Sequence, residues 1–176
     1  MRADHIEASE LQHILAALTP QNRLAMEVAM ATGLRIGDVL QIKTRQLEEA
    51  KDRRITVCEQ KTGKRRRLTV PEPLYMRCLA MAGRLYVFSG RTDWRKPRSR
   101  QAVWKDLRRA AKLFRAPQHV SPHSARKTWA VAEYSKQGDI KRIQRLLNHS
   151  DPAVTALYAM ADALTSRKRP SPIGRP

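Results

Sequence analysis

The sequence predicts a mainly α-helical domain with one small antiparallel β-sheet, an α+β fold. Apolar residues recur at helical spacing through most of the chain. One pair of β-prone runs, residues 55–59 and 68–70, flanks the turn-like segment 61–64 and predicts a β-hairpin that ends at Pro71. At 176 residues the chain has the size of a single domain and is long enough to bury a core.

Helices are expected before this hairpin. Residues 7–18 and 22–32 each place apolar side chains at helical spacing. The second of these helices is expected to stop at Gly33, because a glycine commonly ends a helix. Residues 39–47 are expected to continue as a third helix.

Helices also dominate the chain after the hairpin. Residues 74–88 are expected to form a helix followed by a short strand or loop, and residues 89–98 a basic loop. Ser99 is expected to cap the next helix. The apolar face of that helix comprises Val103, Leu107, Ala110, Ala111 and Phe114.

Two further helices complete the predicted domain. Ser121 and Pro122 are an N-cap and a first-turn proline, which open a helix that extends to about Gln137. Residues 140–147 are expected to form another helix. We therefore assign residues 1–165 to one domain and residues 166–176 to a basic, flexible tail that has little apolar surface to bury.

The chain is strongly basic, with 35 Lys and Arg against 16 Asp and Glu and a formal net charge of +19. A field of that size attracts a polyanion, and nucleic acid is the leading partner. An anionic membrane surface is a weaker alternative, because the basic residues are spread along the chain rather than gathered opposite one apolar helix face. Ribosomal or chromatin-like proteins share such charge, so it predicts binding and says nothing of catalysis.

The sequence also restricts the compartment and the cofactors. No signal peptide is evident, and no apolar run approaches the roughly 20 residues that span a bilayer. Cys58 and Cys78 lack CxxC or Cys/His spacing, so neither a disulfide framework nor a zinc site is predicted. Paired carboxylates with metal-site spacing are not evident either. We expect a soluble, cytoplasmic protein without a metal or cofactor.

Tyr158 stands nine positions after His149. In an unbroken helix, at about 100° per residue, this spacing would put the two side chains on opposite faces. Pro152 is not tolerated inside a helix, so residues 150–152 predict the end of one helix and the capped start of the next. Tyr158 can then fold back toward His149, although a lone tyrosine on a short helix is usually a core residue. Three other tyrosines are expected to be core or half-buried: Tyr75, Tyr86 and Tyr134.

Several other cations suit an anion-binding site. His123 and Arg126 are three positions apart near a helix start, so they share a face, and a cation there is unfavourable unless an anion is bound. Arg35 lies in a tight turn between two helices, where its guanidinium can present paired donors to a phosphate. Lys61 at the hairpin turn can reach a phosphodiester and donate a proton. Taken singly, the His123–Arg126 pair and Arg35 are better explained as solvated surface residues, and Lys61 is explained equally well as a solvated turn lysine.

Four segments, in this order and spacing, resemble the catalytic domain of the tyrosine recombinases, the phage integrase family. They are ATGLRIGDVL at 31–40, KTGKRRRLTVP at 61–71, HSARKTWA at 123–130 and IQRLLNHSDPAVTALYA at 143–159. The resemblance covers roughly residues 7–160 and implies the fold of that domain. It implies a site-specific recombinase or integrase of a bacterium, phage or mobile element. Such an enzyme acts on double-stranded DNA through a 3′-phosphotyrosyl intermediate, as a tetramer on DNA and as a monomer when free.

The same resemblance implies which residues bind the scissile phosphate. Arg35 and Arg126 match the two arginines that clamp it, and His149 matches a histidine that hydrogen-bonds to it. Preplaced donors of this kind stabilise the charge that develops in the transition state without a metal ion.

The resemblance also implies which residues transfer protons and attack. Tyr158 matches the nucleophile, and His123 matches the histidine that assists proton transfer. Lys61 matches the general acid, with Lys64 as the alternative.

The sequence departs from the family pattern at two positions and in its length. Asn148 stands where a glycine often precedes the histidine, and Lys127 stands where a second histidine often follows the arginine. Family members usually carry an N-terminal DNA-binding domain, for which this chain has no room, so we expect either a minimal recombinase or a catalytic fragment. The basic tail would either pack against a neighbouring protomer or bind phosphates.

Two readings compete with the enzyme. One is a non-catalytic DNA-binding regulator or accessory protein that kept the fold, and the other is a basic structural protein that binds nucleic acid. Tyr158 favours the enzyme, because a protein that only binds gains nothing from tyrosine in place of phenylalanine.

Overall fold

The computed structural model describes residues 8–116 and 120–137, together with residues 141 and 143. Its elements are α1 Ala8–Ala16, α2 Pro20–Thr32, α3 Ile36–Leu40, α4 Thr44–Glu48, the 3₁₀ turn η1 Lys51–Arg53, β1 Arg54–Cys58, β2 Arg65–Thr69, α5 Glu72–Met81, α6 Arg100–Leu113 and α7 Pro122–Gln137. β1 and β2 pair antiparallel, with Ile55 opposite Leu68. The predicted fold class, mainly helical with a small antiparallel sheet, is confirmed.

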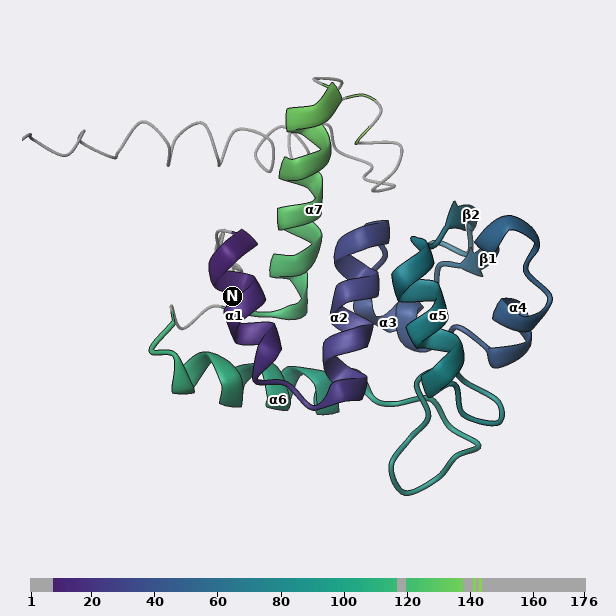
Figure 1. Ribbon diagram of the computed structural model, residues 1–176, viewed down its shortest axis with the longest axis horizontal. Helices are drawn as coiled ribbons and strands as arrows, with labels where there is room; N and C mark the ends of the chain where they lie inside the picture. The colour runs from purple at the N-terminus through teal and green to yellow at the C-terminus, as the bar shows by residue number, and fades with distance from the viewer. Residues whose placement is uncertain (1–7, 117–119, 138–140, 142, 144–176) are drawn as a thin grey trace, which may run out of the picture.

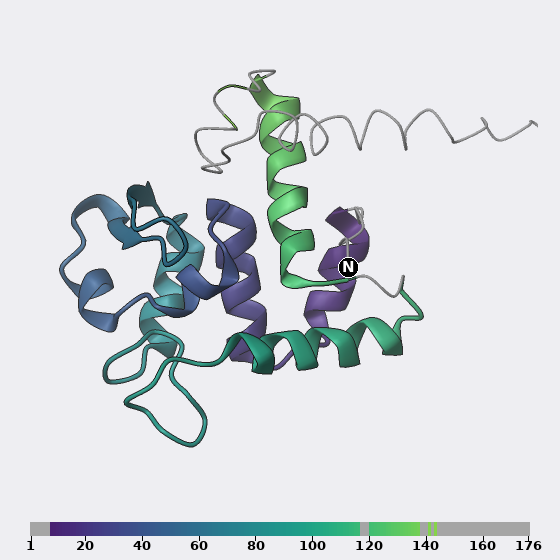
Figure 2. The same ribbon diagram turned by 180° about the vertical axis from the view of Figure 1, so that it is seen from behind.

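The helices form two groups that differ in direction (Figures 1 and 2). α2, α5 and α7 stand upright in this view, and α2 contacts both α5 and α7. α6 runs across the base of α2 and α7 and contacts α1, α3 and α7. The β-hairpin and α4 lie at the end of the molecule away from α1.

The core is apolar and is contributed by nearly every element. Its largest fully buried side chains are Phe88, Leu11, Ile14, Leu15, Leu24, Met26, Leu34, Leu40, Leu47, Ile55 and Leu107. The predicted apolar face of α6 is buried except for Phe114, which is 52% exposed. That part of the prediction was wrong because α6 ends at Leu113, so Phe114 leaves the helical register. Among the described residues, no helix has the length and apolar character required to cross a membrane.

Gly33 ends α2 as the sequence predicts. It adopts a φ of 67°, in the left-handed region that glycine occupies without a steric penalty. A Cβ on this residue would lie 2.6 Å from the ring of Trp129 in α7. The glycine is therefore required both by the turn and by the close packing of α7 against the end of α2.

The third predicted helix, residues 39–47, was wrong as a continuous element. α3 ends at Leu40 and α4 begins at Thr44. Between them, Lys43 forms an isolated antiparallel bridge with Tyr86, and Val87 N–H donates to the Ile42 carbonyl at 3.0 Å. This pairing with a distant segment keeps the chain extended between the two short helices.

The remaining predictions of secondary structure divide into two groups. The hairpin, the helix that Ser99 caps and the helix that Pro122 opens are confirmed. Tyr75, Tyr86 and Tyr134 are half-buried, as expected. The tail 166–176 and nearly all of the predicted helix 140–147 lie outside the described residues, although Ile143 is buried against Ala130.

Candidate active site

Lys61 lies in the turn between β1 and β2, with its side chain exposed. The turn is closed by three backbone hydrogen bonds: Glu59 N–H donates to the Lys64 carbonyl at 3.0 Å, and the N–H groups of Thr62 and Gly63 donate to the Glu59 carbonyl at 3.3 and 2.8 Å. Gly63 has a φ of 67°, which the tight reversal requires. The hairpin thus presents an ammonium group at its tip, as the sequence predicts.

Arg35 is the N-cap residue of α3 and is 21% exposed. Its Nη1 donates to Oε2 of Glu59 at 2.7 Å, and the Glu59 side chain is only 2% exposed. An Arg fork that is fixed by a buried carboxylate still has donors on its other edge. Glu59 was not identified from the sequence, because it is one carboxylate beside a run of basic residues.

His123 and Arg126 lie in the first turns of α7. The Arg126 side chain is buried, and this burial together with the nearby Arg35 lowers its pKa to about 10. His123 keeps an exposed surface, yet its partial desolvation and the charges of Arg126 and Arg35 lower its pKa. His123 is therefore mostly neutral at pH 7, while Arg126 stays charged.

Arg66 is a further cation of this region and was not predicted from the sequence as a site residue. Its Nη2 donates to the Thr32 carbonyl at 2.6 Å, and its guanidinium lies 5.9 Å from the ring centroid of Trp129. Burial lowers the pKa of Arg66, while the nearby Glu59 opposes that change. Strand alternation was the available signal, because Arg66 points inward between two exposed arginines on β2.

Asp38 is the second buried carboxylate of the region, 2% exposed. Its Oδ1 accepts the backbone N–H of Gln60 at 2.9 Å. Burial, and then the nearby Glu59, raise the pKa of Asp38. With Glu59 it offsets part of the charge of the three guanidiniums.

Arg35 and Arg126 both lie close enough to His123 for their charges to lower its pKa. Lys61 lies on the turn that begins at Glu59, and the Glu59 carboxylate is paired with Arg35. His149 and Tyr158 lie outside the described residues. Within the described ranges, no three His, Cys, Asp or Glu side chains are grouped in a way that could hold a metal ion. The assembled groups are donors and cations suited to an anion.

A model of the phage integrase family matches residues 4–164. The chain belongs to the phage integrase family. Probable integrase/recombinase YoeC of Bacillus subtilis is 35% identical over 141 residues, which make up 77% of this chain and 75% of the relative. Tyrosine recombinase XerA of Pyrococcus furiosus is 26% identical over 163 residues, 89% of this chain and 56% of the relative. The family predicted from the sequence is confirmed.

Solved structures of the phage integrase family share the fold. A lambda integrase dimer bound to a COC′ core site superposes with a TM-score of 0.74 at 23% identity, over 100% of this chain and 52% of that one. The XerA recombinase gives a TM-score of 0.70 at 22% identity, over 97% of this chain and 67% of that one. This chain thus spans about half the length of the lambda integrase chain that it matches.

Proposed function

We propose that this chain is the catalytic domain of a site-specific DNA recombinase that cleaves and rejoins DNA through a 3′-phosphotyrosyl intermediate. The observation that carries the proposal is the convergence of Arg35, from the start of α3, with His123 and Arg126, from the start of α7, beside the turn that bears Lys61. Membership of the phage integrase family and the net charge of +19 support DNA as the substrate.

The two arginines would hold the scissile phosphate. Guanidinium groups offer paired N–H donors in a plane and keep their charge at working pH, which suits phosphate oxygens. Because Arg126 is buried among other cations, an arriving phosphate would relieve repulsion as well as accept hydrogen bonds. His149 would add a donor to the same phosphate. Fixed donors of this kind stabilise the charge that develops on phosphorus-bound oxygens in the transition state.

Tyr158 would be the nucleophile. Its oxygen attacks phosphorus while the bond to the 5′-oxygen breaks, and neutral His123 accepts the phenolic proton. Lys61, or alternatively Lys64, donates a proton to the departing 5′-oxygen. The phosphodiester energy is kept in the phosphotyrosyl bond, so a 5′-hydroxyl of another strand can reverse the reaction without ATP.

The assembly on DNA is also part of this proposal. A structural neighbour is described as a dimer of lambda integrase bound to a core site. We expect this chain to bind double-stranded DNA, to act as a tetramer there and to be a monomer when free, in the cytoplasm of a bacterial cell. The residues 166–176 would contact a neighbouring protomer or phosphates.

A covalent-adduct assay tests the proposal. The protein is mixed with labelled duplexes that flank its own gene, denatured in detergent and separated on a gel. We expect an adduct with the wild type and none with Tyr158→Phe, whose DNA affinity should stay unchanged. Tyr86→Phe is the matched control, because Tyr86 is a half-buried tyrosine of another segment. Arg126→Ala should slow adduct formation by at least about 10²-fold, the cost typical of a lost transition-state donor.

The alternatives give different results. Wild-type protein that binds DNA without forming an adduct would favour the non-catalytic regulator. An adduct that persists in Tyr158→Phe would require another nucleophile, and an Arg126→Ala defect below about tenfold would argue against the phosphate clamp.

A further inference from the structure

Glu59 is a buried carboxylate to which the proposed reaction assigns no step. It directly follows β1 and begins the turn that carries Lys61. Its backbone N–H and carbonyl both take part in closing that turn, through Lys64 and Gly63. The side chain is 2% exposed, although a charged group in such a position is costly unless it is paired. Its burial at this position therefore calls for an explanation beyond solubility or surface charge.

One carboxylate oxygen of Glu59 joins two parts of the candidate site. Oε2 accepts from Arg35 Nη1 at 2.7 Å and from the Thr62 hydroxyl at 3.1 Å. Arg35 belongs to the phosphate clamp, and Thr62 is the immediate neighbour of Lys61. A second link runs in parallel, from Gln60 N–H to Asp38 on α3 at 2.9 Å. The hairpin turn is thus anchored to the start of α3 by two buried carboxylates.

The charge of Glu59 matters as much as its hydrogen bonds. Its carboxylate favours the charged forms of both Arg126 and Arg66, whose pKa values it acts to raise. Without that charge, three guanidiniums would face one another with Asp38 as the remaining buried counter-ion among the described residues. The Arg35 side chain would then move away from the cluster toward solvent.

We propose that Glu59 is a positioning residue of this site, which fixes the Arg35 guanidinium and the Lys61 turn relative to each other through a single carboxylate oxygen. The inference rests on the proposed recombinase reaction. Glu59 acts through both partners: it orients the donors that Arg35 turns to the phosphate, and it holds Lys61 at the departing 5′-oxygen. A misplacement of about 1 Å in such a constellation can cost about 10²-fold in rate.

Three variants separate these effects. Glu59→Gln keeps the shape and removes the charge, whereas Thr62→Val keeps the charge and removes the hydroxyl that donates to Glu59 and accepts the Lys64 N–H at 3.4 Å. Glu49→Gln is the matched control, because it removes an equal charge from the exposed ion pair with Arg45 on α4. In protein without DNA, the heteronuclear ¹⁵N NOE of the amides of residues 60–64 reports turn mobility. We expect it to fall in Glu59→Gln and to match wild type in Glu49→Gln.

The second measurement is the rate of adduct formation on the duplex that the wild type cleaves. It is made with the ordinary 5′-oxygen and with sulfur in its place, since a thiolate leaves without a proton from Lys61. Glu59→Gln should be about 10- to 100-fold slower on the oxygen substrate. Sulfur should restore Thr62→Val fully and Glu59→Gln only in part, because the displacement of Arg35 persists.

The outcomes are distinct. The proposal is overturned if Glu59→Gln forms adduct within about twofold of Glu49→Gln, or if sulfur fails to restore Thr62→Val. A defect that tracks a lowered melting temperature of Glu59→Gln, with an unchanged NOE of the turn, would also overturn it. If the wild type forms no adduct, the recombinase reaction itself fails, and the NOE alone then decides whether Glu59 fixes the turn.

Discussion

His123 carries an imidazole whose protonation its surroundings oppose. Its partial desolvation and the charges of Arg126 and Arg35 lower its pKa below the usual value. The unfolded chain therefore binds the proton more readily, so this residue should make the folded state less stable as pH falls below about 6.5. Well above pH 7, His123 is neutral in both states and its effect disappears.

This prediction is measured as the free energy of unfolding in urea between pH 8 and pH 5. The stability of the wild type should decline across that range, and His123→Gln should decline less. His13→Gln is the control, since His13 is exposed on α1. If the free energy of unfolding changes with pH equally in the wild type and in His123→Gln, the arginines do not lower the pKa of the imidazole.

At the same scale, the sequence points to the cations of the candidate site and not to its carboxylates. Arg35, His123 and Arg126 stand out because each has a motif and a chemical reason to bind a phosphate. Glu59 and Asp38 have no such motif, since their role depends on which guanidinium the fold places beside them. Arg66 stands among other basic residues in the sequence, and it differs from Arg65 and Arg67 only because its position on β2 faces inward.

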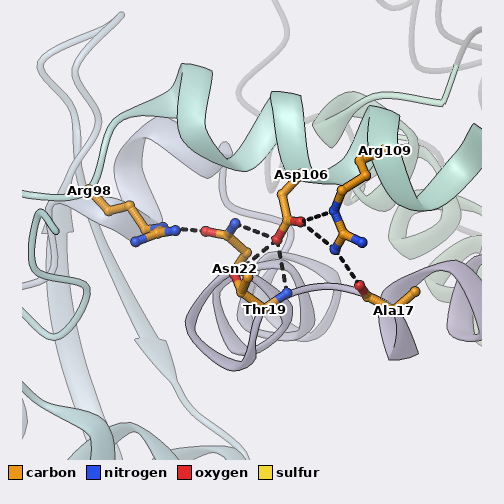
Figure 3. Close-up of polar contacts among 6 residues, drawn as sticks. All are labelled: Ala17, Thr19, Asn22, Arg98, Asp106 and Arg109. Atoms are coloured by element: carbon orange, nitrogen blue, oxygen red, sulfur yellow. Dashed lines mark hydrogen bonds and ion pairs between the residues drawn. The ribbon is translucent and has the colours of Figure 1, made fainter.

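Among the elements, α6 is joined to the start of α2 by a polar network around Asp106 (Figure 3). Oδ2 of Asp106 accepts hydrogen bonds from Thr19 N–H at 2.9 Å and from Asn22 Nδ2 at 2.7 Å. Oδ1 of Asp106 accepts from Arg109 at 2.7 Å. Arg109 in turn donates to the Ala17 carbonyl at 2.7 Å. The carboxylate also lies at the positive end of the α2 dipole, which stabilises its charge.

Asp106→Asn should therefore destabilise the fold. Burial alone would raise the pKa of Asp106, but the hydrogen bonds from Arg109, Asn22 and Thr19 lower it to about 2. The unfolded value is near 3.8, so the charged form contributes about 2 kcal/mol above pH 4 and loses that contribution as pH falls toward 2. Urea unfolding at pH 7 should show this loss in Asp106→Asn, with Asp93→Asn in the exposed loop as the control. A loss of less than about 0.5 kcal/mol in the free energy of unfolding would show that the network does not stabilise the packing of α6 against α2.

The helix boundaries show where the local sequence pattern is no longer sufficient to predict the secondary structure. Ser99, Pro122 and Gly33 mark helix ends by their own chemistry, and the structure has helix ends at all three. The break between α3 and α4 has no such marker, since it arises from the pairing of Lys43 with Tyr86, far along the chain. A helical periodicity across residues 39–47 is consistent with either outcome until that partner is known.

For the whole molecule, the excess of basic residues predicts how it would bind DNA in the proposed reaction. A net charge of +19 implies that binding releases many counterions, so the affinity for non-specific duplex should fall roughly 10³-fold or more between 50 and 200 mM salt. Arg65 and Arg67 are exposed on β2, flanking the inward Arg66 next to the candidate site. If the DNA lies across this hairpin, both should contact phosphates.

Replacing either arginine by glutamine should then reduce the slope of log affinity against log salt by about one. Arg45→Gln serves as the comparison, because Arg45 is exposed on α4 and already paired with Glu49. The slopes are measured by fluorescence anisotropy on one labelled duplex, with all variants at the same pH. Slopes that fall in Arg45→Gln and not in Arg65→Gln or Arg67→Gln would place the DNA on a different face, away from the arginines that we assign to the scissile phosphate.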